Sequence, residues 1–183
     1  MTVEPSVNGA AALYTREVLA ERLGTARFER VLCGALTATD RETYDHVWGS
    51  GWLPLRISEA VIDACANELG RDPEAFAHEV VLESSGRAIA RIYRVALRFA
   101  WEEALVARAP ALYRRIRNVG ELEARFVHRG AADAVVTGWA LSARAARSLA
   151  TSLEAMLLAA GKENVRIAIA MRRDGASFEI RWE

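Results

Sequence analysis

The sequence predicts an α+β fold in which an N-terminal helical lobe is followed by a four-stranded antiparallel sheet of ββαββ order. Up to about residue 120, apolar residues recur at the spacing of amphipathic helices. At Glu121 the spacing changes to alternation, which is typical of half-buried strands. Two pairs of alternating segments then flank one further helical segment. The predicted helical lobe spans 11–120, and the predicted ββαββ lobe spans 121–183.

Turn and cap residues divide the helical lobe into six or seven short helices. Gly24 and Gly70 suit helix ends, because glycine readily adopts the left-handed conformation found there. Asp72 followed by Pro73 is a strong helix start, whereas the SSG segment at 84–86 predicts an interruption. The expected helices are, in chain order, one ending at Gly24, one from Thr25 through Leu36, a short one from Asp40 to Trp48, one capped by Ser58, one from Asp72 to about Glu83, one from Ile89 to Phe99, and one that carries Leu105, Leu112 and Ile116 with a kink at Pro110.

Four strands are predicted after Glu121. In ELEARFVH, Leu122, Ala124 and Phe126 alternate with charged residues, and Asp174 with Gly175 favours a hairpin turn near the end of the chain. The predicted strands are 121–128, 132–139, 164–171 and 177–182, with a helix beginning near Ser142. The side chains expected to meet between the sheet and this helix are Val165, Ile167, Ile169, Phe178, Ile180 and Trp182 on the strands and Leu149, Leu153, Met156, Leu157 and Ala160 on the helix.

The whole chain is expected to form one structural unit. Residues 1–10 precede the first periodic residues and are expected to be disordered, whereas 11–183 is expected to be a single domain. A chain of 183 residues that is 52% hydrophobic can bury a sizeable core. No internal repeat and no low-complexity linker separates the two lobes.

Composition excludes several broad classes of protein. Twenty-four basic residues balance 24 acidic ones, so no overall field attracts nucleic acid, and no nucleic-acid partner is expected. No stretch approaches the length of an uncharged apolar membrane span, and the N-terminus lacks a basic segment followed by an apolar run. Cys33 and Cys65 both fall in helical patterns and do not make a disulfide framework. We therefore expect a cytoplasmic protein.

The residues that usually carry catalysis are sparse and scattered. His46, His78 and His128 lack the spacing that brings two metal ligands together from one element. The chain contains no G-x-S-x-G elbow, no C-x-x-C pair and no Walker loop. We therefore predict no catalytic residues, no metal site and no enzymatic activity.

A row of arginines is the first candidate binding feature. Arg87, Arg91, Arg94 and Arg98 recur every three or four residues and share one face of a predicted helix. Such a row can bind an acidic partner, and we predict a partner-binding surface there. The alternative is a solvated helix face whose arginines pair with nearby glutamates.

Aromatic residues in the helical lobe are the second candidate. Trp48, Trp52, Tyr93 and Trp101 could line a pocket for a small apolar ligand between the lobes. The alternative is that aromatic residues at helical spacing simply fill the core. A pocket lined by these residues would favour ligand binding, whereas a filled core with an exposed apolar patch would favour protein interaction.

Three stretches carry a family resemblance: AVIDACANELGRDPEAFAHEV in the helical lobe, PALYRRIRN at its end, and ALSAR between the second strand and the next helix. This arrangement resembles the heme-nitric oxide/oxygen binding (H-NOX) superfamily over about residues 11–183. The resemblance implies that superfamily's fold, which 4-vinyl-reductase-type and TRAPP-type tethering domains share. In length and in its final tryptophan-bearing strand, the chain also resembles a large myxobacterial family of paralogues without established activity.

The resemblance bears directly on heme. In sensor members of the superfamily, a Y-x-S-x-R motif binds the heme propionates, and a histidine in a helix before the sheet binds the iron. The matching positions here are Ala140, Ser142 and Arg144, so the tyrosine is absent, and 102–118 contains no histidine. The resemblance therefore implies that the heme-ligating motif is lost, and no cofactor is expected.

The segment WALSARAARSL, 139–149, has two interpretations. Ser142 is placed to cap the helix that follows, which makes the segment a structural connection between strand and helix. Ser142 and Arg144 at a helix N-terminus could also bind a carboxylate or phosphate, because the amides and the helix dipole favour negative charge there. We favour the structural interpretation and retain both residues as ligand-binding candidates.

Two functions remain for the chain. The first is a non-catalytic sensory or regulatory module that binds a small apolar ligand, not heme, or a protein partner. The second is a protein–protein interaction or oligomerisation module without any small-molecule ligand. A protein partner or self-association is expected in either case.

Overall fold

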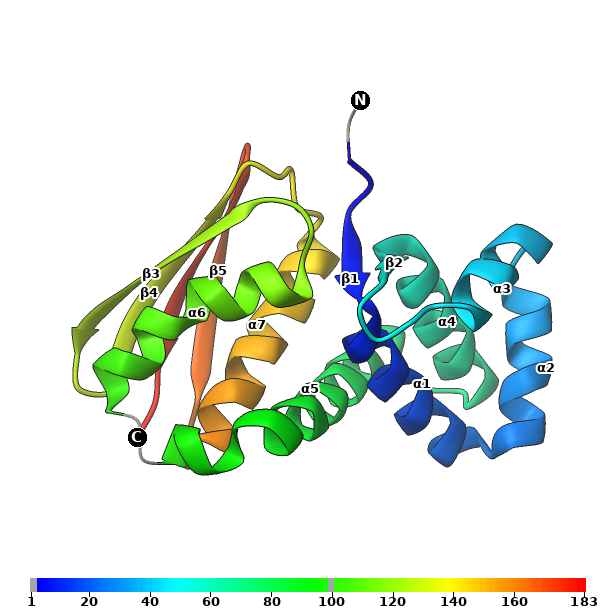
Figure 1. The fold of residues 1–183 in the computed structure, drawn as a ribbon, viewed down its shortest axis with the longest axis horizontal. Helices are drawn as coiled ribbons and strands as arrows, with labels where there is room; N and C mark the ends of the chain where they lie inside the picture. The colour runs from blue at the N-terminus through cyan, green and yellow to red at the C-terminus, as the bar shows by residue number, and fades with distance from the viewer. Residues whose placement is uncertain (1–2, 99–100) are drawn as a thin grey trace.

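The chain folds into the helical lobe and the ββαββ lobe that the sequence predicts (Figure 1). The computed structural model describes residues 3–98 and 101–183, with the side chains of 3–90 and 101–183. The helices and strands are β1 (Ser6–Asn8), α1 (Gly9–Leu23), α2 (Thr25–Ala35), α3 (Ala38–Asp45), β2 (Trp52–Pro54), α4 (Leu55–Glu68), α5 (Pro73–Arg98), α6 (Glu102–Ile116), β3 (Glu121–His128), β4 (Ala131–Thr137), α7 (Ala143–Ala159), β5 (Arg166–Arg172) and β6 (Gly175–Arg181).

The sheet of the second lobe has the order β3-β4-β6-β5, and every neighbouring pair is antiparallel. Phe178 of β6 lies at the centre of the sheet, opposite Ala134 of β4 and Ile169 of β5. Its side chain is 1% exposed and packs with Leu149 and Met156 of α7, as the alternating pattern predicts. The two hairpins and the intervening helix therefore form the expected ββαββ unit, with α6 and α7 on the side of the sheet that faces the helical lobe (Figure 1).

The helical lobe has its own core. Phe28, Leu32, Ile57 and Phe76 are at most 1% exposed and belong to one cluster of buried side chains. Helix α5 packs against α1 and α4 of this lobe and also against α7 of the other lobe. Helix α5 contributes Phe76 and Val80 to this cluster and Ile89 to the cluster of the sheet lobe, and it lies between the lobes (Figure 1). In the described part of the chain, no helix is both long enough and apolar enough to cross a membrane.

Helix α5 differs from the sequence-based prediction. The SSG segment at 84–86 predicted an interruption, but the helix continues without a break from Pro73 to Arg98. Ser84 is buried, its hydroxyl donates to the Val81 carbonyl oxygen, and Thr15 of α1 donates to it at 3.3 Å. The cost of about 1 kcal/mol for a glycine within a helix is small beside the packing of α5 on both sides.

The N-terminal segment also differs from the prediction. The residues 1–10 were expected to be disordered, but Ser6–Asn8 form β1, and α1 already begins at Gly9. The β1 strand pairs with β2, and the partners lie more than forty residues apart in the sequence, at Ser6↔Pro54 and Asn8↔Trp52. Local periodicity carries no information about such a pairing, because two three-residue strands are too short to show a pattern.

Four residues are suited to cap a helix in the sequence, and the structure confirms Asp72 and Ser142 but not Thr25 and Ser58. Thr25 lies in the first turn of α2, and Ser58 lies inside α4, which begins three residues earlier at Leu55. Ser142 caps α7 as expected, since its Oγ accepts a hydrogen bond from the Ala145 amide at 3.0 Å. Ser142 therefore has a structural role, as the residue that starts α7 after the loop from β4.

Glu102, at the start of α6, joins this helix to the sheet lobe. Its carboxylate accepts hydrogen bonds from Lys162 Nζ at 2.6 Å and from the Gly130 amide at 3.0 Å. Burial by itself would raise the pKa of Glu102, but the hydrogen bonds and the Lys162 charge outweigh this effect and lower the pKa to about 2. The ionised carboxylate therefore stabilises the folded chain.

Replacing Glu102 by glutamine should lower the free energy of unfolding at neutral pH by about 1 to 2 kcal/mol. Because the folded pKa is lowered, the stabilisation is fully present above the ordinary value of 4.5 and is lost as the pH falls toward about 2. Urea unfolding at about pH 7 and about pH 3 measures this change. The difference between wild type and Glu102→Gln should shrink at the lower pH, while the difference for the exposed control Glu123→Gln should stay constant.

Candidate ligand-binding site

A cavity of about 790 Å³ lies between the two lobes. Residues of β1, α1, α4, α5, α6, α7 and β5 line it, so both lobes contribute to its wall. Its volume falls within the roughly 300–1,000 Å³ of small-molecule sites. The wall is mainly aliphatic or small, and its larger apolar members include Ile62, Val81, Ile89, Leu112, Leu153 and Ile167. The cavity can therefore accept an apolar molecule.

A buried arginine interrupts this apolar wall. Arg117 directly follows α6 and is only 6% exposed. Its amide donates to the Tyr113 carbonyl oxygen, and its Nη2 donates to Ser148 Oγ at 3.3 Å. Its Nε and Nη1 atoms are buried and have no hydrogen-bond partner among the described residues. Burial lowers the pKa of the Arg117 guanidinium, because an apolar environment disfavours its charged form.

Glu59 of α4 is the acidic residue whose charge acts on the Arg117 guanidinium. Its carboxyl is half-buried, and burial raises its pKa while the charges of Arg144 and Arg117 oppose that shift. Its Oε1 atom is buried and has no hydrogen-bond partner among the described side chains and backbone, although it lies 3.9 Å from Arg144 Nε. Arg117, Ser148 and Glu59 thus form a polar corner of the cavity, and we use this name for the three residues below.

Arg144 lines the cavity but is already paired. Its Nη1 and Nη2 donate to both carboxylate oxygens of Asp63 at 2.7 and 2.6 Å. This pair joins α7 to α4 and therefore ties one lobe to the other. The structural role is evident for Arg144, as it is for Ser142, which is exposed and caps α7.

The predicted aromatic residues lie elsewhere. Trp48 is 76% exposed, Trp52 is 41% exposed, and Trp101 is 86% exposed, and none of these three lines the cavity. Trp48 lies in the loop between α3 and β2, Trp52 begins β2, and Trp101 stands at the N-cap of α6. Tyr93 falls among the side chains outside the described part of the structure. The structure thus places the cavity away from the described tryptophans.

The predicted arginine row is only partly described. Arg87 donates to both carboxylate oxygens of Glu21 at 2.9 and 2.6 Å and also pairs with Glu83. The side chains of Arg91, Arg94 and Arg98 lie outside the described residues. For Arg87 the geometry is that of a helix-surface ion pair, which was the alternative to a partner-binding role.

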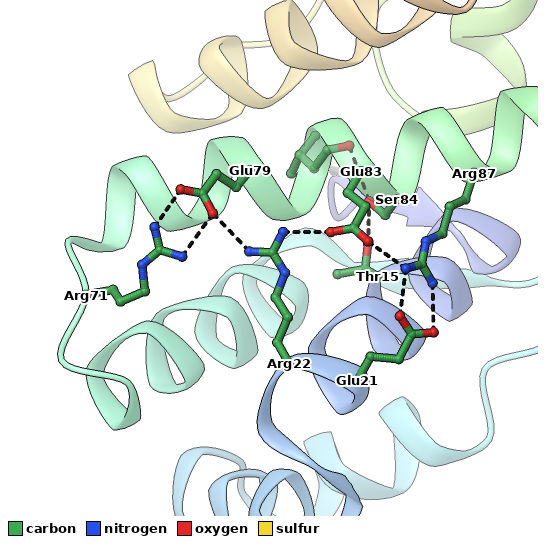
Figure 2. Close-up of polar contacts among 9 residues, drawn as sticks. Thr15, Glu21, Arg22, Arg71, Glu79, Glu83, Ser84 and Arg87 are labelled. Atoms are coloured by element: carbon green, nitrogen blue, oxygen red, sulfur yellow. Dashed lines mark hydrogen bonds and ion pairs between the residues drawn. The ribbon is translucent and has the colours of Figure 1, made fainter.

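Arg87 is one end of a larger network between α1 and α5. Figure 2 shows a row of alternating charges in which Arg22 bridges Glu79 and Glu83, at 3.0 and 2.6 Å. Arg71 pairs with Glu79 at the other end of the row. The guanidinium groups of Arg22 and Arg71 also lie 5.6 and 5.3 Å from the centre of the Phe76 ring. The network serves the packing of the helical lobe.

Histidines do not form a metal or catalytic cluster in this structure. Across residues 3–98 and 101–183, no group of three or more histidine, cysteine, aspartate and glutamate side chains could hold a metal ion. His46 and His128 make local hydrogen bonds to backbone carbonyl oxygens. His78 lines the cavity, and its Nε2 lies 3.0 Å from Glu154 Oε2.

The described residues do not reproduce the heme-ligating positions that the H-NOX resemblance implies. Heme iron needs an axial side chain such as histidine, and α6 contains none. His78 is half exposed and is held by Glu154 on α7. The arginine at the motif position, Arg144, is neutralised by Asp63, and the tyrosine position holds the exposed Ala140.

Sequence reasoning missed Arg117 and Glu59. Arg117 lies in the run RRIRN together with Arg114 and Arg115, both of which are exposed. Nothing in that run distinguishes the buried arginine from its exposed neighbours. Glu59 stands beside Ser58 in a helix whose apolar face was recognised, but the pattern does not reveal that α7 and α6 approach from the other lobe.

Comparisons with known proteins identify the fold. No family model matches the chain, and no curated protein matches it in sequence. Among solved structures, an H-NOX protein from S. oneidensis in the Fe(II)NO ligation state matches with a TM-score of 0.70 at 11% identity, covering 96% of this chain and 99% of that chain. A mutant H-NOX protein from K. algicida, Fe(II) and unliganded, matches with a TM-score of 0.69 at 6% identity and 96% coverage of both chains. The chain therefore has an H-NOX-like fold, as the resemblance predicted.

Proposed function

We propose that this chain of H-NOX-like fold is a non-catalytic sensory or regulatory module that binds a small apolar ligand other than heme in the cavity between its lobes. The cavity itself carries the proposal, because a largely aliphatic space of about 790 Å³ provides favourable burial for an apolar molecule. Its position between α4, α5 and α7 supports a sensory role, since a ligand there contacts both lobes at once.

The solved H-NOX structures support the placement of a ligand between such lobes only as an analogy of fold. Their titles describe Fe(II) and Fe(II)NO states of those proteins. This chain differs at the residues that would hold a heme, and the exclusion of heme is part of the proposal. Native mass spectrometry of protein expressed with heme precursors tests it, because a retained heme would appear as added mass.

Filling the cavity should abolish binding of a neutral apolar probe. Ala88 of α5 lines the cavity, and an Ala88→Trp side chain would occupy part of the space. We expect the affinity for N-phenyl-naphthylamine, measured by its fluorescence, to fall at least about tenfold. The control is Ala26→Trp, at an exposed position of α2 outside the cavity wall. Equal binding by wild type and both variants would contradict the proposed site, and no binding by wild type would contradict the proposed function.

Self-association or binding of a protein partner is the second candidate function. The observation in its favour is the exposure of Trp48 and Trp101, which are large apolar side chains on the surface. The same native mass spectrum reports the number of subunits. A ligand-free dimer or larger species, weakened by Trp48→Ala or Trp101→Ala, would support this function over ligand binding.

A further inference from the structure

Arg117 and Glu59 of the polar corner both have buried side-chain atoms without a hydrogen-bond partner among the described residues, and Arg117 is the cation of the two. A buried guanidinium normally pairs with a carboxylate or forms hydrogen bonds with several acceptors, because an unpaired buried charge is costly. Arg117 is 94% buried, and one contact of 3.3 Å, from Nη2 to Ser148 Oγ, is the side-chain hydrogen bond that the described residues provide. At least two of its donor atoms, Nε and Nη1, have no partner among these residues.

No described carboxylate forms a hydrogen bond or ion pair with Arg117, although the Glu59 charge favours the charged form of its guanidinium. Asp63 is engaged by both terminal nitrogens of Arg144. Among the described residues, Glu59 makes no hydrogen bond to Arg117, and its ion-pair partner is Arg144 Nε, at 3.9 Å. The polar corner thus contains a cation, at the wall of an apolar cavity, with donor atoms that no described residue accepts from.

We propose that the ligand of this cavity is an aliphatic molecule with a single carboxylate and that Arg117 binds this carboxylate. The proposal rests on the proposed function and adds the chemical class of the ligand. The planar guanidinium matches a carboxylate in geometry and supplies charge-assisted hydrogen bonds. The hydroxyl of Ser148, which lies beside it, is a second donor. The aliphatic body then lies against the apolar wall formed by residues such as Ile89, Leu112 and Ile167.

The charge balance selects a carboxylate over a phosphate. One guanidinium can neutralise one negative charge of a ligand, whereas a phosphate monoester carries about −1.5 to −2 at neutral pH. The Glu59 carboxyl faces the same corner and would repel the additional charge. Arg144 offsets only part of this repulsion, because both of its terminal nitrogens already bind Asp63.

A substitution of Glu59 tests carboxylate binding at Arg117 independently. If the ligand carboxylate binds Arg117, an ionised Glu59 competes with it for the polar corner. The Glu59→Gln variant removes this competing charge and keeps a hydrogen-bonding side chain. Binding of a carboxylate should then become several-fold tighter, while binding of a neutral alcohol should not change.

The experiment is titration calorimetry of ligand-free protein with decanoate and with decanol at neutral pH. Wild type should bind decanoate at least about tenfold more tightly than decanol. Arg117→Met should bind both with similar affinity, and Arg117→Gln repeats the test should the methionine variant not fold. The control Arg108→Met removes an exposed arginine of α6 outside the cavity wall and should keep the preference for decanoate.

Each result has a distinct meaning. A preference for decanoate in wild type that disappears in both Arg117 variants supports the proposal. Equal binding of acid and alcohol by wild type, or a preference that survives in the Arg117 variants, overturns the carboxylate site while the apolar ligand module stands. Binding of neither molecule, with no binding of longer or shorter members of the two series, overturns both the inference and the proposed function.

Discussion

Replacing Phe76 or Phe178 by alanine is expected to lower the free energy of unfolding by about 3 to 5 kcal/mol in each case. Phe76 is fully buried in the helical core, and Phe178 is 1% exposed in the core between the sheet and α7. Truncation removes most of a buried aromatic side chain and leaves a cavity that the neighbouring helices and strands can close only in part. These are the largest effects expected from single substitutions in the chain.

The same two variants test the prediction that residues 11–183 form a single domain. Because α5 packs on α1 and α4 and also on α7, a loss of stability in one core should shift the unfolding of both lobes together. Urea unfolding followed by far-ultraviolet circular dichroism reports the helices, and tryptophan fluorescence includes Trp182 of the sheet core. The control Met171→Ala, at a half-exposed position of β5, should change stability by less than about 0.5 kcal/mol. Two separate transitions, of which each variant moves only one, would contradict a single domain.

Arg117→Met is expected to raise the free energy of unfolding of ligand-free protein by about 1 to 3 kcal/mol. Methionine fills a similar volume without a charge, so the variant no longer buries a guanidinium with unpaired donors. The lost hydrogen bond to Ser148 Oγ is long, at 3.3 Å, and offsets little of this gain. A residue that costs stability in the empty protein and gains a partner only with a ligand is expected at a binding site.

Urea unfolding of ligand-free wild type, Arg117→Met and Arg108→Met measures this effect. The Arg108 control should remain within about 0.5 kcal/mol of wild type, because Arg108 is exposed. A loss of stability in Arg117→Met would show that the guanidinium serves the fold, and it would argue against the carboxylate site. Added decanoate should stabilise wild type more than the methionine variant.

The local patterns of the sequence determined most of the secondary structure. The change of period at Glu121, the Asp174-Gly175 hairpin signal and the cap at Ser142 each depend on neighbouring residues only. The start of α5 at Pro73 is equally local, because Asp72 Oδ1 accepts a hydrogen bond from the Ala75 amide at 2.8 Å. Such features need no knowledge of distant segments, and the structure confirms all of them.

Contacts between distant segments decided the rest of the fold. The continuation of α5 through 84–86 depends on α1 and α7, which pack on opposite sides of it and outweigh the weak helix propensity of two serines and a glycine. The pairing of β1 with β2 joins segments whose local sequence carries no strand pattern. Propensity is a local quantity, whereas these outcomes were set by burial and backbone pairing across the chain.

The candidate site depends even more than the fold on contacts between distant segments. The sequence by itself indicated an H-NOX-like fold and the loss of the tyrosine and histidine positions, since both follow from residue identity along the chain. It could not indicate that Arg144 would pair with Asp63 or that Arg117 would be buried, because these depend on how closely α4, α6 and α7 approach. Arginine side chains are exposed at most positions in proteins. Only the tertiary structure decides which arginine is buried without gaining a hydrogen-bond partner for its guanidinium.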